Sequence, residues 1–154
     1  MIAMCNYEQL QDEALDGYYN DLALNSFDQV IKRFPDSKYS KDSRQKIILV
    51  KSNIAAKHME IGRFYLENKK YIAALNRFKI IIDEFSMTKF TPEALHRMVE
   101  AYYEMGMHED SYNTAALLGY NYPESNWYKY SYNLVKQIEG EESFLKKIRN
   151  FFDG

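Results

Sequence analysis

His96 and Glu100 are the residues whose types and spacing could most readily do chemistry, with Glu104 one turn further along. A separation of four places both side chains on one face of a helix, where they could ligate a metal ion or act as an acid–base pair. A protein metal site needs three or four converging ligands, and the sequence offers no obvious others. We therefore expect a solvated helix face here, with no metal, no cofactor and no catalytic residue.

Other motifs that carry chemistry are missing from the sequence. It has no Gly-rich phosphate loop, no nucleophile elbow and no pair of cysteines, because Cys5 stands alone. The run Ile2-Ala3-Met4-Cys5 superficially resembles a lipoprotein cleavage box, yet Met4 stands where a small residue is expected. We interpret Cys5 as a small buried apolar residue. These observations predict a protein that is not an enzyme and takes no small-molecule substrate.

The composition excludes two further classes of function. Hydrophobic residues make up 46% and charged residues 27% of the 154 residues, which is typical of one globular domain. The 20 basic and 22 acidic side chains give a net charge of −2, whereas nucleic-acid binding needs a basic excess on one face. No run of about 18 apolar residues is present, so the sequence predicts no membrane-spanning helix.

The elements that position these residues follow helical spacing. Only three prolines and six glycines occur, which is sparse punctuation for a β protein. The clearest apolar stripe recurs at intervals of three and four residues, as on one face of a helix. Its members are Tyr71, Ala74, Leu75, Phe78, Ile81, Ile82 and Phe85.

Two stretches repeat one order of large, small and aromatic residues. The first is Ile61, Gly62, Tyr65, Ala74, Phe78 and Ile81, and the second is Met98, Val99, Tyr102, Ser111, Ala115, Leu118 and Pro123. Such a pattern is typical of tetratricopeptide helix pairs, in which small residues stand where the helices cross closely. We predict an all-α, tetratricopeptide-like solenoid of about three helix pairs plus a C-terminal capping helix.

The spacing of the repeats is uneven. The closing aromatics Phe34, Phe85 and Tyr122 are 51 and 37 residues apart, and the longer interval has no turn signal within it. We therefore expect one long helix over about 38–68. The run Thr91-Pro92-Glu93 is a helix start signal, with Thr91 as the cap.

These signals divide the single domain into segments. We expect a repeat over 1–35 with a truncated first helix, repeats over 38–86 and 91–122, a capping helix over 124–138 and a tail over 139–154. The opening helix, Met1 to Leu10, has no cap and is nearly all apolar, which suggests that the chain is a fragment of a longer protein. In the tail, the stretch 144–152 is amphipathic and carries Lys146, Lys147 and Arg149.

In each helix pair, the positions of the first helix that lie off the apolar core stripe should face a concave groove. A mixed polar, aromatic and Met surface there suits a peptide or the edge of a protein. The expected groove residues are Met59, Arg63, Leu66, Glu67, His96, Glu100 and Tyr103.

Several longer runs resemble the BamD family, the tetratricopeptide lipoproteins of the bacterial outer-membrane β-barrel assembly (BAM) machine. The most specific are Glu60-Ile61-Gly62-Arg63-Phe64-Tyr65-Leu66 and the run from Tyr71 to Lys79. The resemblance continues in two later runs, Pro92-Glu93-Ala94-Leu95 and Tyr122-Pro123-Glu124-Ser125-Asn126-Trp127-Tyr128. The resemblance covers roughly residues 1–135 and matches the last three of the family's five repeats.

The resemblance implies a location and a set of partners. It implies a protein at the periplasmic face of the outer membrane, tethered by an N-terminal lipid that this chain does not carry. It also implies docking on a POTRA domain of the barrel subunit BamA, together with other BAM subunits. Arg77, in the run Asn76-Arg77-Phe78, matches a family position implicated in pairing with an acidic residue of the docked POTRA domain.

A generic tetratricopeptide adaptor that binds a peptide or protein in its concave groove is the alternative. Recognition of peptide C-termini would need a cluster of basic and Asn side chains in the groove. The sequence supplies only Arg63, beside Met59 and Glu67.

Overall fold

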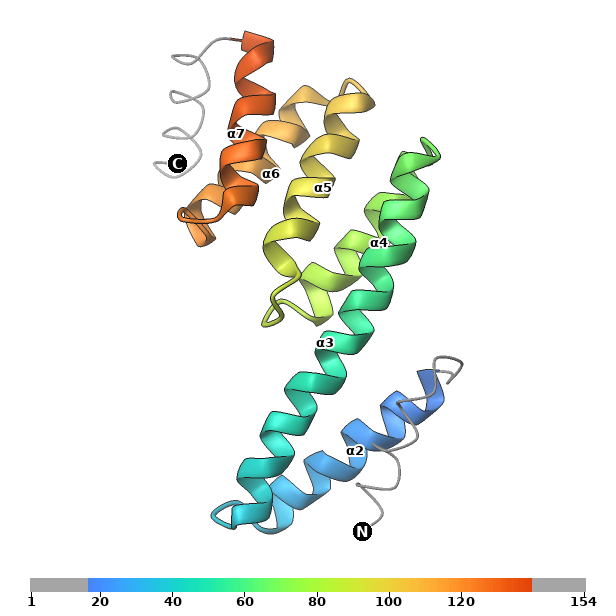
Figure 1. Cartoon of the computed structure of the whole chain (residues 1–154), viewed down its shortest axis with the longest axis vertical. Coiled ribbons are helices and arrows are strands. Elements are labelled where there is room, and N and C mark those ends of the chain that lie inside the picture. Colours follow the sequence, from blue (N-terminus) through green and yellow to red (C-terminus); the bar gives the residue numbers. More distant parts are fainter. Residues whose placement is uncertain (1–16, 140–154) are drawn as a thin grey trace. The chain divides into compact units, whose positions relative to one another are not determined.

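The structure is a computed structural model that describes residues 17–139, and every regular element within them is an α-helix (Figure 1). This confirms the all-helical, tetratricopeptide-like fold class. None of the described helices is long and apolar enough to cross a membrane. Cys5, the expected opening helix and the tail beyond residue 139 lie outside the described residues. The helices are α2 (Gly17–Arg33), α3 (Lys38–Glu67), α4 (Tyr71–Glu84), α5 (Thr91–Glu104), α6 (His108–Asn121) and α7 (Asn126–Glu139).

The chain forms two compact units that divide between Ile54 and Ala55. In the first unit, α2 packs on the first part of α3 through buried Ala23, Phe27 and Val50. Ser37 starts α3, because its Oγ accepts a hydrogen bond from the Ser40 backbone N–H at 3.1 Å. This is the geometry of a helix N-cap.

The second unit contains the rest of α3 and helices α4 to α7. Its helix pairs repeat with a shift of 37 residues. Helices α4 and α6 begin at Tyr71 and His108, and the helices before them end at Glu67 and Glu104. The repeat that the residue pattern predicts is therefore present in the backbone.

The turns inside the two pairs are also alike. Lys69 and Gly106 both have left-handed backbone conformations, with φ of 57° and 72°. Each turn closes with a backbone hydrogen bond from the next residue, Lys70 to Tyr65 at 2.8 Å and Met107 to Tyr102 at 2.9 Å. This is the Schellman ending of a helix, which usually takes glycine.

Close packing inside each pair depends on a small residue facing a larger one. Phe78 is fully buried, and a Cβ added at Gly62 would lie 2.4 Å from its Cε1 atom. A shift of 37 residues carries this pair to Val99 and Ala115, which share a core cluster with Tyr112 and Val135. The second pair therefore fills the space between its helices differently, with the larger residue on α5 and the smaller one on α6.

The start of α5 differs from the expectation in one detail. Thr91 is the first residue of the helix and not its cap, and the preceding Phe90 makes no side-chain capping bond. The Thr91 hydroxyl instead donates to the Ser86 carbonyl at 2.9 Å, within the turn before the helix. Glu93 consequently stands in the first turn of α5, near the positive end of the helix dipole.

Candidate functional site

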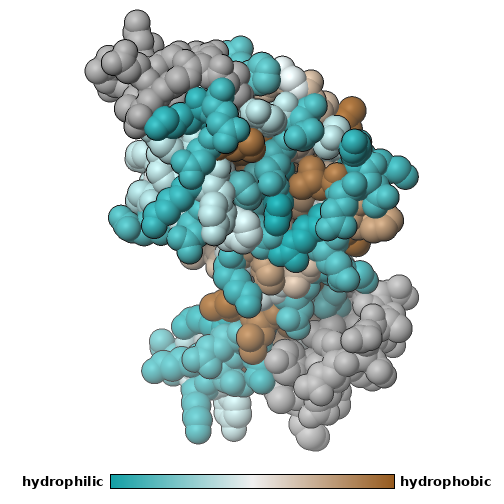
Figure 2. Space-filling model, turned by 45° about the horizontal axis from the view of Figure 1, so that its top comes forward, coloured by the Kyte–Doolittle hydropathy of each residue, from teal (hydrophilic) through white to brown (hydrophobic). Residues whose placement is uncertain are grey.

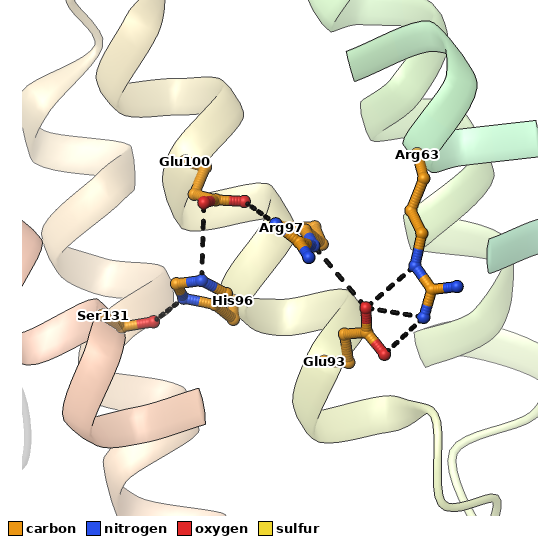
Figure 3. Close-up of polar contacts among 6 residues, drawn as sticks. All are labelled: Arg63, Glu93, His96, Arg97, Glu100 and Ser131. Carbon is orange, nitrogen blue, oxygen red and sulfur yellow. Dashed lines mark hydrogen bonds and ion pairs between the residues drawn. The ribbon is translucent and has the colours of Figure 1, made fainter. Parts of the chain in front are cut away.

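A network of six polar side chains runs along α5 and joins it to α3 and α7 (Figure 3). We call it the α5 network. All its members belong to the second unit, and Figure 3 shows them pointing toward one another from three helices. They are Arg63 from α3, Glu93, His96, Arg97 and Glu100 from α5, and Ser131 from α7.

The shortest contacts of the network join Arg63 to Glu93. The Arg63 Nη2 atom lies 2.7 and 2.6 Å from the two Glu93 carboxylate oxygens, and its Nε atom lies 2.9 Å from Oε1. The Glu93 side chain is 10% exposed and that of Arg63 is 42% exposed. This planar, forked contact is the strong form of an ion pair, and it ties α3 to the first turn of α5.

The other half of the network centres on Glu100. Arg97 donates from Nη1 to Glu100 Oε2 at 2.8 Å, and the His96 Nε2 atom lies 3.5 Å from Oε1. The His96 Nδ1 atom is 2.8 Å from the Ser131 hydroxyl, and the Arg97 guanidinium lies over the Trp127 ring. These contacts hold one side of α5 against α7.

Glu100 is held in its charged form. Burial acts to raise its pKa, but the hydrogen bonds from His96 and Arg97 and their charges outweigh it, so the pKa lies below the ordinary value. A carboxylate with a lowered pKa accepts protons poorly at neutral pH. The arrangement suits the joining of helices better than general acid–base chemistry.

Two of the expected groove residues are buried, and the expectation that they face a partner is wrong. Met59 is 0% exposed and His96 is 5% exposed. They occupy equivalent positions, 37 residues apart, so the error has a single origin. This position faces inward: His96 packs against the Trp127 ring and bonds to Ser131, both on the following first helix.

The remaining expected residues are at least partly accessible, and they fall into two groups. Arg63 and Glu100 take part in the α5 network, so their polar groups already have partners. Glu67 is exposed, and Leu66, Tyr103 and Arg77 are half-buried. Whether any of them meets a partner stays a prediction.

Sequence reasoning missed three members of the network. From the sequence we interpret Glu93 only as a helix-start residue, and we single out neither Arg97 nor Ser131. The recurrence of Glu93, Arg97 and Glu100 at spacings of four and three on one helix is the signal that could have revealed the α5 side of the network. Within residues 17–139, no group of three or more His, Cys, Asp or Glu side chains is arranged to hold a metal ion.

The Arg63–Glu93 pair should contribute measurably to stability. Replacing Arg63 with methionine leaves a nearly buried carboxylate with only Arg97, whose Nε atom is 3.6 Å away. An exposed pair contributes about 0–1 kcal/mol, and breaking a fully buried pair costs about 3–5 kcal/mol. Because Arg63 is partly exposed, we expect Arg63→Met to lower the free energy of unfolding by about 1–3 kcal/mol.

Denaturant unfolding followed by circular dichroism measures this loss. Lys79→Met removes an exposed cation from α4 and should change the free energy of unfolding by less than about 0.5 kcal/mol. The double variant Arg63→Met/Glu93→Met should be more stable than Arg63→Met, because it removes the uncompensated charge. Equal stability of Arg63→Met and the wild type would mean that the ion pair does not contribute to the free energy of unfolding.

Comparison with known proteins gives one consistent result. The sequence model of the YfiO family, described as "Outer membrane lipoprotein", matches residues 1–118. The chain is 44% identical over 137 residues to "Outer membrane protein assembly factor BamD" of Rickettsia prowazekii, covering 89% of this chain and 55% of that protein. The protein of the same name from Caulobacter vibrioides is 41% identical over 133 residues, or 86% and 44% of the two chains.

The chain thus spans about half the length of the curated relatives it matches. A third relative, with the same printed name and from Neisseria meningitidis serogroup A, is 30% identical over 106 residues. The family match covers well over half of the chain and includes the first helix pair of the second unit. The chain belongs to the YfiO family of outer membrane lipoproteins.

Proposed function

We propose that the chain is a non-catalytic scaffold of outer-membrane β-barrel assembly, acting at the periplasmic face of that membrane by docking on a POTRA domain of BamA. Support for the general role comes from the family and from relatives that carry the name of an outer membrane protein assembly factor. Support for docking comes from the surroundings of Arg77. A scaffold is also consistent with the α5 network, whose polar groups are engaged with one another.

Arg77 is the observation that carries the docking proposal. It lies on α4, is half-buried, and has no ion-pair partner within 4.0 Å among the described residues. Burial and the nearby charges of Arg77 and Lys57 lower the pKa of His58 on α3, against the opposing effect of Glu84. The Arg77 guanidinium thus lies close enough to His58 to add positive potential there. A carboxylate from a partner would supply the missing charge in a fork geometry that arginine favours.

The residues around Arg77 suit an interface. Helical spacing places Ala73 and Ile80 on the same side of α4 as Arg77, and both are half-buried. Ile72, one position before Ala73, is 67% exposed. Figure 2 shows that one face of the molecule is largely hydrophilic with small hydrophobic patches between the polar residues. An arginine beside such apolar side chains is a common composition of interface hot spots.

Calorimetry with a purified BamA POTRA domain tests the proposal. Arg77→Glu is expected to leave the helix content unchanged and to weaken binding tenfold or more, about 1.4 kcal/mol. The loss of one member of a desolvated charge pair costs about 2–5 kcal/mol, so tenfold is a conservative expectation. Lys79→Glu is the matched control, because it makes the same charge change at an exposed position of α4.

A charge change on the partner locates the contact. A change of an acidic POTRA residue to lysine should restore part of the affinity of Arg77→Glu. An identical affinity for wild type and Arg77→Glu would remove Arg77 from the interface. Absence of binding by the wild-type chain would contradict the docking proposal itself.

A further inference from the structure

A hollow of about 330 Å³ opens beside the α5 network in the second unit. Helices α3, α5 and α7 contribute to it, together with the turn before α4 and the first residue of α4. This volume is at the lower end of that found for ligand pockets, so it suits one or two side chains of a longer segment. The lining residues are Leu66, Glu67, Lys69, Tyr71, Arg97, Glu100, Glu104 and Leu134.

The rim of the hollow is acidic. Glu67 and Glu104 occupy equivalent positions of the two repeats, both are exposed, and neither has an ion-pair partner within 4.0 Å in the described part of the chain. Glu100 and Arg97 also line the hollow but bind each other. Lys69 is the remaining cation, so three carboxylates face two cations.

The ends of two helices add to this negative potential. Helices α3 and α5 end at Glu67 and Glu104, and neither has a basic residue in its last turn. The C-terminal end of a helix carries a partial negative charge that a cation normally offsets. A positively charged side chain in the hollow would therefore be attracted by both glutamates and by both helix ends.

Three of the half-buried residues that line the hollow are apolar or aromatic, and we call these three the floor. Leu66, Tyr71 and Leu134 are half-buried and come from α3, α4 and α7. An apolar side chain placed on them would lose contact with water while a neighbouring cation stayed at the rim. The same acidic rim repels a carboxylate, so the hollow is unsuited to a peptide C-terminus.

We propose that this hollow binds a segment of a partner protein in which a lysine or arginine stands next to an aromatic or aliphatic residue. The basic group lies between Glu67 and Glu104, and the apolar side chain rests on the floor. Arg77 does not line the hollow. The proposal therefore goes beyond POTRA docking and does not depend on it.

Fluorescence anisotropy with the full chain and a labelled probe peptide tests this assignment. The probe is acetylated and amidated Gly-Ser-Lys-Phe-Lys-Ser-Gly, and saturable one-to-one binding is expected. Glu67→Gln/Glu104→Gln should raise the Kd at least about fivefold. Glu60→Gln/Glu124→Gln removes two exposed carboxylates elsewhere in the second unit and should change the Kd less than about twofold.

Variants of the probe separate the two halves of the site. Glutamate in place of both lysines should abolish binding, and serine in place of phenylalanine should weaken it at least about fivefold, as expected for an apolar side chain that leaves a pocket. Arg77→Glu should leave the Kd for the probe unchanged, so failure of POTRA docking and failure of this site are distinguishable.

Three results would overturn the proposal. The first is absence of saturable binding by the wild-type chain. The second is an equal loss of affinity in the two double variants, which would mean that only net charge attracts the probe. The third concerns the chain's own basic residues: if Lys146→Gln/Lys147→Gln/Arg149→Gln tightens probe binding at least about fivefold, the occupant is this chain and not a partner.

Discussion

Replacing Phe78 with alanine is expected to lower the free energy of unfolding of the second unit by about 3–5 kcal/mol, the usual range for a buried phenylalanine. Phe78 is 0% exposed, and its ring lies directly against the backbone of α3 at Gly62. Because the short turn between Glu67 and Tyr71 holds α3 and α4 together, the two helices can close only partly over the cavity that the ring leaves. The cost of the cavity therefore adds to the lost burial of the ring.

Trp127 provides the measurement for this prediction. It is the only tryptophan of the chain and lies on α7, so its fluorescence reports on unfolding of the second unit. Phe64→Ala is the matched control, because Phe64 is on α3 and is 59% exposed. Phe64→Ala should lower the free energy of unfolding by less than about 1 kcal/mol, in line with most surface substitutions. A loss that small for Phe78→Ala would show that the ring is not a core wedge.

The helices and their pairing could be predicted from the sequence because they depend on local signals. Apolar spacing, the three prolines and the absence of a turn signal between residues 38 and 68 define most of the boundaries. The expected long helix over 38–68 corresponds to α3, Lys38–Glu67. The expected capping helix over 124–138 corresponds to α7, Asn126–Glu139. Both depend on spacings of three and four residues, which a single helix fixes by itself.

The repeat register could also be predicted, because small residues recur in the sequence at the positions where two helices cross closely. Gly62 lies against the Phe78 ring, and Ala74 and Phe78 are both fully buried. In the second pair, Ser111 takes the place of Ala74 and donates its hydroxyl to the Val99 carbonyl. A small polar residue is tolerated there because that one bond satisfies it.

The orientation of the first helices was not predictable to the same precision. Met59 and His96 lie at the boundary between the core stripe and the groove, where a rotation of one helix by a fraction of a turn decides burial. That rotation is set by the next helix in the stack. For His96 the deciding partners, Trp127 and Ser131, lie on α7, more than 30 residues away in the sequence.

The α5 network could not be derived for the same reason. Its two longest links, Arg63 to Glu93 and His96 to Ser131, span 30 and 35 residues. Helical periodicity places each of these side chains on a face, but it does not give the angle at which two helices cross. The ion pairs within α5 are local and were open to prediction, whereas those between helices were not.

Gly62→Val is expected to destabilise the second unit by about 3 kcal/mol, at the upper end of the range for overpacking. A Cβ at this position would lie 2.4 Å from Phe78 Cε1 and 2.9 Å from two further ring carbons. The ring is fully buried, and close packing in a protein core leaves such a ring little room to move. Valine therefore forces α3 and α4 apart, even though it favours a helix slightly more than glycine does.

The second repeat indicates how this loss can be reversed. Its equivalents of Gly62 and Phe78 are Val99 and Ala115, and both are fully buried. In a Phe78→Ala background, Gly62→Val should therefore cost little or should stabilise, because valine fills part of the space that the ring leaves. The two substitutions should show a favourable coupling free energy of about 2–3 kcal/mol, near the upper limit for residues in contact. A double-mutant cycle followed by Trp127 fluorescence measures it, and additive losses would mean that Gly62 and Phe78 do not share one packing volume.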